Sequence, residues 1–265
     1  MLQMRIRFGI ILIGLIGVIC LCGCNGNNAP VKNSQSNANS NTPRVAIPPP
    51  LAPAERLDAS FKPCNDYYPL VPGSVMKYVI HYSSGLVADL TVVVDSEEEG
   101  GRKIFKKRSQ IVDRSGGMEI VQSTTSKFAC DGNRVIILSE VNEQNVAGNQ
   151  SASEFRFRDN SLMMADPQTV ARKGSTWSHA FYTTFRSAAQ PDAKEDTPTI
   201  VYFEVGDSAV VTTPVGNFKA TIIIRKVKQN VTYDYYAPGV GLVKRESKEG
   251  TYWELKEFSG LKAAE

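Results

Sequence analysis

Residues 218–258 read FKATIIIRKVKQNVTYDYYAPGVGLVKRESKEGTYWELKEF and decide the fold class of the chain. β-Branched and aromatic side chains dominate this stretch, and they alternate with polar ones in the period of a strand. Turn signals at Pro238-Gly239 and Lys248–Gly250 interrupt the alternation. The stretch therefore predicts four short antiparallel strands joined by hairpins. They are Phe218–Lys228, Val231–Tyr236, Gly241–Ser247 and Thr251–Phe258.

The same pattern extends back along the chain, with Gly206-Asp207 as one of its turns. Residues 142–153 are polar and predict a loop, and residues 183–197 predict a short helix or a mobile loop. Roughly ten to twelve short strands without βαβ alternation predict an all-β domain with little helix. We expect a single antiparallel, strongly curved sheet or a barrel-like domain, with a sandwich as the other option. The further expected strands are Val75–Tyr82, Val87–Asp95, Arg102–Asp113, Met118–Phe128, Arg134–Val141, Glu154–Arg158, Thr199–Val205 and Ser208–Thr213.

Composition limits the classes of protein to consider. The chain has 265 residues, of which 42% are hydrophobic, and this is enough to build a sizeable core. Its net charge of +3 is too near neutral for a nucleic-acid binder that works through a basic surface. Two His and five Cys are too few for a rich metal site, so we expect no metal and no cofactor.

The first 24 residues have the layout of an export signal. Arg5 and Arg7 precede an apolar run, Phe8–Leu21, of about 14 residues, which is short of the roughly 20 that a spanning helix needs. Leu21-Cys22-Gly23-Cys24 then resembles the lipobox of bacterial lipoproteins. That resemblance implies diacylglyceryl transfer to the thiol of Cys24, cleavage after Gly23 and acylation of the new amine. The alternative is an uncleaved anchor helix.

Cleavage of residues 1–23 would remove Arg5 and Arg7 and lower the net charge from +3 to +1. Residues 24–60, rich in Asn, Ser and Pro, predict a disordered tether with a span of roughly 30 Å. Residues 61–265 form the predicted antiparallel β domain. Because Asn25 is not Asp, the usual inner-membrane retention signal is missing. We expect a lipid-anchored protein of the cell envelope, in the outer membrane facing the periplasm or the cell surface if the organism has two membranes.

Two motifs carry a resemblance to a known family. Asp66–Tyr78 reads DYYPLVPGSVMKY, and Tyr235–Glu246 reads YYAPGVGLVKRE. Together with Thr213–Phe218 (TPVGNF), they resemble the poorly characterised TapB-like group of bacterial envelope proteins. Met76 stands where that family commonly has Trp. The resemblance implies secretion and a β-rich fold, and it transfers no catalytic residue.

Cys64 and Cys130 are the cysteines that remain besides the lipidated one. In an oxidising envelope they predict one disulfide. The bridge would close a loop of about 66 residues and stabilise the fold by ~4 kcal/mol in the chain-entropy model. Two free thiols or an intermolecular bond are the alternatives.

Other motifs have a structural interpretation beside a functional one. Gly206-Asp207-Ser208 is similar to the nucleophile block of some lipases, but a hairpin turn explains it better. His81 and His179 are isolated, and we see no acidic or thiol partners at the spacing of a metal site. Residues 102–108 (RKIFKKR) form a basic strand, which either contacts anionic lipid or protects a sheet edge.

Aromatic residues crowd the two ends of the predicted domain. The simpler interpretation is that these residues pack in the core. The more specific one is that they form a platform on which a carbohydrate stacks. These residues are Tyr67, Tyr68, Tyr233, Tyr235, Tyr236, Tyr252 and Trp253.

The sequence favours a non-catalytic envelope lipoprotein with a structural, assembly or docking role. Its expected partners are the lipid bilayer, through acylated Cys24, and an envelope protein. The alternative is a carrier that holds a lipid or other apolar ligand in the concave face of its sheet. A cavity of roughly several hundred Å³ would favour the carrier, and an exposed apolar patch would favour docking. An envelope hydrolase would need a catalytic constellation that we do not find.

Overall fold

The computed structural model describes residues 51–58, 60–114, 120–146, 149–187, 193–194 and 197–263. The predicted signal peptide, the lipobox with Cys24 and most of the predicted tether lie outside the described residues. In the described part of the chain, no helix has the length and apolar character needed to cross a membrane.

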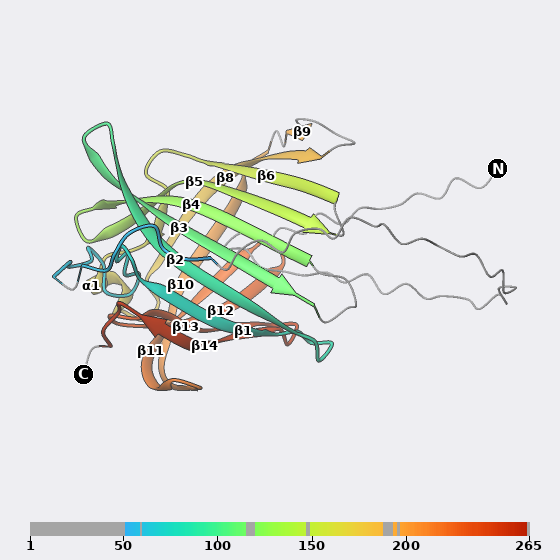
Figure 1. Cartoon of the computed structure of the whole chain (residues 1–265). Coiled ribbons are helices and arrows are strands. Elements are labelled where there is room, and N and C mark those ends of the chain that lie inside the picture. Colours follow the sequence, from blue (N-terminus) through green and yellow to red (C-terminus); the bar gives the residue numbers. More distant parts are fainter. Residues whose placement is uncertain are drawn as a thin grey trace, which may run out of the picture.

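The chain folds into one antiparallel sheet that closes into a barrel (Figure 1). The strand order is β10-β11-β12-β13-β14-β1-β2-β3-β4-β5-β6-β8, and β8 pairs with β10 to close the ring of twelve. Strand β7 pairs with β5, and β9 pairs with β8, but neither is one of the twelve strands of the ring. The prediction of an all-β, barrel-like domain with little helix is confirmed. The elements are β1 Val75–His81, β2 Val87–Glu99, β3 Arg102–Asp113, β4 Ile120–Asp131, β5 Arg134–Val146, β6 Asn149–Phe157, β7 Leu162–Met164, α1 Pro167–Val170, β8 Thr176–Ser187, β9 Ala193–Lys194, β10 Thr199–Thr213, β11 Gly216–Val227, β12 Asn230–Ala237, β13 Gly241–Ser247 and β14 Tyr252–Ser259.

The turn predicted at Gly206-Asp207 is wrong. Thr199–Thr213 is one continuous strand, β10, and the pairing of β10 with β11 shifts register between Val205 and Ser208. The Gly-Asp pair is therefore the site of a β-bulge, which inserts extra backbone and bends the strand without ending it.

Two predicted irregular segments belong in part to strands. The predicted loop 142–153 contains the end of β5 and the start of β6, and the predicted helix or loop 183–197 contains the end of β8. Polar residues such as Asn142 and Ser153 occupy the inward positions at the facing ends of β5 and β6, so the apolar alternation that identifies a strand is missing there.

Residues 61–74 and α1 lie at one end of the barrel (Figure 1). The apolar core contains residues of this end, such as Leu70 and Val170, and residues of the opposite end, such as Tyr82 and Val227.

Asn65 fastens the end where residues 61–74 lie. Its Nδ2 donates to the backbone oxygens of Asn133 and Ala165, each at 2.8 Å, and its Oδ1 accepts from two backbone N–H groups. A buried amide with all of these bonds satisfied ties three distant segments together.

Residues 51–58 lie against the outer face of β2, although the disordered tether was predicted to include them. The N–H of Ala54 donates to Oδ1 of Asp95 at 2.6 Å. Val93 has the same outward orientation as Asp95, yet it is fully buried. Ordered contacts with the sheet therefore begin before residue 61, where we placed the start of the β domain.

Candidate functional site

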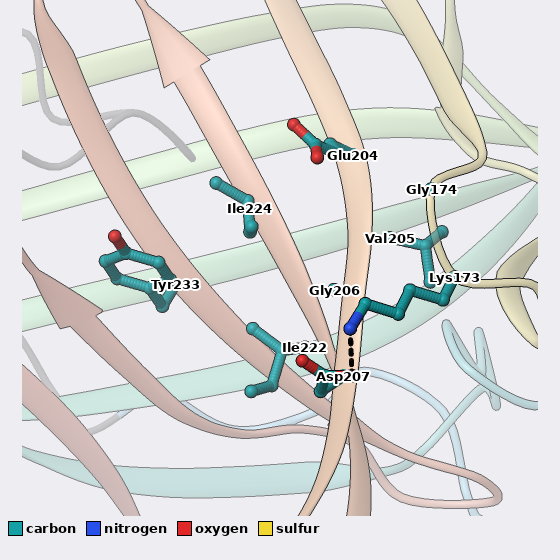
Figure 2. A pocket seen from close by; sticks show the side chains of 9 residues that line it. All are labelled: Lys173, Gly174, Glu204, Val205, Gly206, Asp207, Ile222, Ile224 and Tyr233. Atoms are coloured by element: carbon teal, nitrogen blue, oxygen red, sulfur yellow. Dashed lines mark hydrogen bonds and ion pairs between the residues drawn. The ribbon is translucent and has the colours of Figure 1, made fainter.

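The bulge in β10 opens a pocket on the outer face of the barrel (Figure 2). Its volume is about 290 Å³, near the lower end of the range for ligand sites. Gly206 lies in the pocket wall, and a Cβ there would meet the side chain of Ile222 at 3.4 Å. The missing side chain of Gly206 thus helps to leave the pocket empty.

The floor of the pocket is apolar and comes from neighbouring strands. Ile224 on β11 pairs with Tyr233 on β12 and with Glu204 on β10. Ile224 and Tyr233 are partly exposed. The side chain of Ile223 points to the other face of β11, into the core, and is 1% exposed. The alternation of β11 therefore places two isoleucines, 222 and 224, on the outside of the barrel.

Two ion pairs flank this floor. Lys173 Nζ lies 2.5 Å from Asp207 Oδ1, and this pair joins the loop after α1 to the bulge (Figure 2). Lys226 Nζ lies 2.8 Å from Glu204 Oε2. Because the side chains of both pairs are well exposed, each pair contributes little to stability and can exchange partners with an incoming charged group.

An exposed apolar surface continues from the pocket along β10. Ile200 is 42% exposed and Tyr202 is 54% exposed, and both share the outward face of β10 with Glu204. Tyr182 on the neighbouring strand β8 is also exposed. We call Tyr182, Ile200 and Tyr202 the outer apolar face. Together with the pocket, it offers an apolar floor, a charged rim and large exposed side chains, which suits non-covalent binding.

A smaller cavity lies inside the barrel beside Tyr68, Tyr78, Lys107 and Tyr236. Its volume is about 20 Å³, which is room for one water molecule. The Tyr78 hydroxyl donates to the backbone oxygen of Leu242 at 2.8 Å. Burial, followed by the nearby Tyr236, raises the pKa of the Tyr78 hydroxyl, so Tyr78 is neutral at physiological pH.

Cys64 and Cys130 form the predicted disulfide, with their Cα atoms 6.2 Å apart. The bond joins the segment before β1 to the end of β4.

The two histidines lie in different environments. His81 is on the outer face, where it stacks on Tyr252 at 4.4 Å and lies 3.2 Å from Glu254. His179 is buried, and burial lowers its pKa to about 4 although a hydrogen bond to Leu162 opposes the shift. No group of three or more potential metal-ligating side chains occurs in the described part of the chain.

The basic stretch 102–108 is not a sheet edge, because β3 pairs with β2 on one side and with β4 on the other. The edge-protection explanation is therefore wrong. Lys106 contacts Glu97, and Arg108 binds Asp95 on the outside of the barrel, whereas Lys107 points into it.

The predicted aromatic cluster divides between the two faces of the barrel wall. Tyr68 and Tyr236 are buried inside, in line with the core-packing interpretation. Tyr235 and Tyr252 are partly exposed, and the Nζ of Lys244 lies 5.8 Å from each of their rings.

The sequence did not predict a buried cluster of one acidic and two basic side chains. Asp234 on β12 lies between Arg225 on β11 and Arg245 on β13, and all three residues are at most 3% exposed. Burial and the neighbouring Arg245 charge lower the pKa of Arg225 to about 10, so Arg225 remains charged at neutral pH. The alternation of β11 could have indicated that Arg225 is buried, because its side chain points to the same face of the strand as those of the core residues Ile223 and Val227.

Comparisons with known proteins add little to these observations. No family model matches the chain, and no curated protein matches it. The chain is similar to a solved structure from Bacteroides fragilis, of a protein described as exported and as having a YmcC-like fold. The TM-score is 0.45 at 15% sequence identity, over 74% of this chain and 100% of that chain. Similarity at this level carries no argument about function.

Proposed function

We propose that this chain is a membrane-anchored envelope lipoprotein with a non-catalytic docking role. In this proposal the acyl chains on Cys24 hold it to the bilayer, and the barrel presents its outer pocket to another envelope protein. A partner would insert an apolar side chain against Ile222 and Ile224, with its flanking charges near Lys173 and Glu204.

The observation that carries the proposal is the continuity of the pocket with the outer apolar face. Large apolar side chains exposed next to a concave apolar floor are typical of interaction sites. Tyr202 and Ile200 present such side chains, and Gly206 leaves the neighbouring depression open. An aromatic anchor beside a pocket matches the usual composition of interface hot spots.

The alternative, a carrier for a lipid or other apolar ligand, has weaker support. Its ligand would need an apolar interior of several hundred Å³. The interior cavity beside Tyr68 has room for about one water molecule, and inward side chains of β4 and β5 such as Ser126 and Asn142 are polar. These features suit an apolar ligand poorly.

Membrane anchoring is tested by replacing the acylated cysteine. We expect Cys24→Ser to abolish lipid attachment and to move the protein from the membrane fraction to the soluble fraction. Mass spectrometry of the native protein should show an N-terminus at Cys24 carrying acyl chains. An unmodified Cys24, or a membrane-bound Cys24→Ser variant, would contradict the anchor.

Docking is tested by placing a photo-crosslinking amino acid at Tyr202 in the full-length protein in intact cells. We expect one dominant crosslinked partner, and we expect Gly206→Leu to remove it by filling the pocket. Gly206 does not have a left-handed φ, so a side chain is compatible with the backbone there.

The matched control is the same crosslinker at Val87, which is 50% exposed on β2. It should not capture the partner that Tyr202 captures. A crosslink that survives Gly206→Leu, or equal capture from Tyr202 and Val87, would reject the outer pocket as the docking site. Melting curves of Gly206→Leu establish that the variant is folded.

A further inference from the structure

One edge of β10 has no neighbouring strand beyond the bulge, in the part of the chain that the structure describes. Before the bulge, β8 pairs with β10 as far as Glu204, and the loop that leads into β8 bonds to the next residue. The N–H of Val205 donates to the oxygen of Ser175, and its own oxygen accepts from the N–H of Gly174. Beyond the bulge, the described pairs of β10 are all with β11, as far as Thr213. The side of β10 that faces β8 is therefore open there, and we call it the open edge.

The backbone groups of Ser208, Val210 and Thr212 point to the open edge. Val205 directs its N–H and C=O toward the β8 side, as its two hydrogen bonds show. Between Val205 and Ser208, β10 gains one residue on the facing stretch of β11, so the alternation shifts by one. After the bulge the even-numbered residues therefore face the open edge, and the residues between them bond to β11. Such a row of donors and acceptors is a template for an added strand.

The open edge has the composition of a paired strand. Residues 208–213 read SAVVTT, which is rich in β-branched side chains and contains no charge and no Pro. Edge strands that face solvent commonly carry Lys, Pro or an inward charge, which discourage pairing. Val210, in the middle of the open edge, is 74% exposed, more than any residue of the outer apolar face. The sequence therefore leaves this edge suitable for pairing with another chain.

The other face of the hairpin is packed, which holds the open edge in position. Val211 and Phe218, which pair with each other, are 6% and 7% exposed and belong to the apolar core. The ring of Phe218 lies 6.2 Å from the ring of Phe258 on β14. At the tip, the Thr213 hydroxyl donates to the backbone oxygen of Gly216 at 3.2 Å. Because the edge is already extended and held, pairing with a partner strand costs it little conformational entropy.

The exposed face of the hairpin carries one positive charge. Lys219 pairs with Val210 across the hairpin, and it forms no ion pair with another described residue. The neighbours Ser208, Thr212 and Asn217 are uncharged. A symmetric pairing of two copies, centred on Val210, would bring two Lys219 ammonium groups to one face and supply no carboxylate for either. An acidic side chain on the strand of a different protein would supply it, so the charge favours that occupant over a second copy.

We propose that β10 accepts an extended segment of a partner protein as an additional strand along residues 208–213. The segment places an apolar side chain beside Val210 and an acidic one near Lys219. This inference rests on the docking role proposed above, and it adds the conformation and the charge of the partner segment. The open edge begins next to Asp207, which also lines the outer pocket, so one partner can occupy both. Backbone hydrogen bonds supply the affinity of such an added strand, and its side chains supply the specificity.

Crosslinking in intact cells tests strand addition in the full-length protein. A photo-crosslinking amino acid is placed at Ser208, Val210 or Thr212, one position at a time, and mass spectrometry identifies the captured residues. We expect all of these positions to capture the partner that Tyr202 captures. The captured residues should lie in one segment, and a step of two residues on β10 should correspond to about two residues on the partner. Val87 again provides the control position, and it should not capture this segment.

The outcomes separate this inference from the docking role on which it rests. If Tyr202 captures a partner and Val210 does not, strand addition is rejected and docking stands. Capture from Val210 alone would support the added strand and reject the outer pocket, and capture from neither position would reject both. A second copy of this chain captured from Val210, or captured residues scattered over the partner sequence, would overturn the proposal.

Matched variants separate backbone pairing from side-chain contact. The probe is a synthetic peptide of the captured segment, titrated against the full-length protein in detergent. We expect Val210→Pro to weaken binding about tenfold, because it removes an N–H from the open edge. Val210→Thr keeps the N–H and the β-branched shape and should weaken binding less. Melting curves verify that Val210→Pro is folded, and Thr212→Pro provides the same reading if it is not. Wild-type binding by the folded Pro variant would exclude an added strand.

Charge reversal tests the predicted acidic residue of the partner. We expect Lys219→Glu to weaken binding of the same peptide about threefold or more. Lys228→Glu, in the exposed turn at the other end of β11, is the control and should bind like the wild type. Equal effects of the two reversals would contradict the charge assignment. If Gly206→Leu abolishes binding while Val210→Pro binds like the wild type, the outer pocket holds the partner without an added strand.

Discussion

Asp234 on β12 faces Arg245 on β13 directly across the strand pair, and two guanidinium nitrogens reach its carboxylate, Nε at 2.5 Å and Nη2 at 2.7 Å. Burial opposes the charge of Arg245, but the contact with Asp234 holds the pKa of Arg245 above its ordinary value. The pair is therefore a charged, bidentate contact inside the barrel. Because the pair is buried and bidentate, breaking it should lower the free energy of unfolding more than breaking an exposed ion pair of the outer surface.

Removing the buried carboxylate should be costly. Asp234→Ala leaves Arg225 and Arg245 without their shared anion in a desolvated site, so we expect a loss of about 3–5 kcal/mol in the free energy of unfolding. Urea unfolding followed by tryptophan fluorescence measures it. Glu257→Ala breaks the exposed pair with Lys77 and should cost less than ~1 kcal/mol. Similar losses for the two variants would contradict this account.

Acid should destabilise the barrel through His179. Its pKa is about 4 in the folded state, against about 6.5 in the unfolded chain, so the unfolded state binds the proton more tightly. Stability therefore falls as the pH drops from 6.5 to 4, by about 3 kcal/mol in total from this group. We expect His179→Gln to flatten the pH dependence of the melting temperature in this window, while His81→Gln retains it. An unchanged slope in His179→Gln would exclude His179 as the source.

Loss of the Cys64–Cys130 disulfide should destabilise the end of the barrel where the segment before β1 lies. The bond closes a sequence separation of 66, so we expect reduction or the double Cys→Ala variant to cost about 2–5 kcal/mol. Denaturation with and without reducing agent measures the difference. If the double variant and the oxidised protein unfold at the same urea concentration, the bond makes no net contribution.

The segment 51–58 should be protected from proteases by its contacts with β2. Both carboxylate oxygens of Glu55 accept from Ser96, from its N–H at 2.5 Å and from its hydroxyl at 3.1 Å. We expect Glu55→Ala to cost ~1–2 kcal/mol and to open a cleavage site within 51–58, mapped by mass spectrometry after limited proteolysis. Glu98→Ala, an exposed residue of β2, is the control. Equal cleavage of wild type and Glu55→Ala would show that this bond does not hold the segment.

Sequence reasoning succeeded where strands alternate between an apolar and a polar face. The predicted strand Arg102–Asp113 coincides with β3, for example. It failed for the facing ends of β5 and β6, where inward residues such as Asn142 are polar and conceal the period. It also missed β8, although Trp177 and Phe181 alternate with polar residues there and contact the core. The polar inner face therefore explains why the facing ends of β5 and β6 were missed.

The outer pocket was beyond sequence reasoning for a different reason. A Gly-Asp pair between two apolar runs is a common hairpin signal, and only the pairing with β11 shows that the strand continues through it. The buried ion cluster could not be predicted without knowing which face of the barrel each charged residue of β11, β12 and β13 occupies. Each of its charged residues, considered alone, could equally face solvent.

The pairing of β1 with β14 has a consequence for the order of events in synthesis. Met76 pairs with Phe258, so the seam joins the beginning of the barrel to its end. A growing chain has no partner for this side of β1 until the last strand has emerged, and such distant pairings form slowly. The ring of strands therefore cannot close before β14 has been made, which is compatible with export through a secretion channel of the kind that the first 24 residues predict.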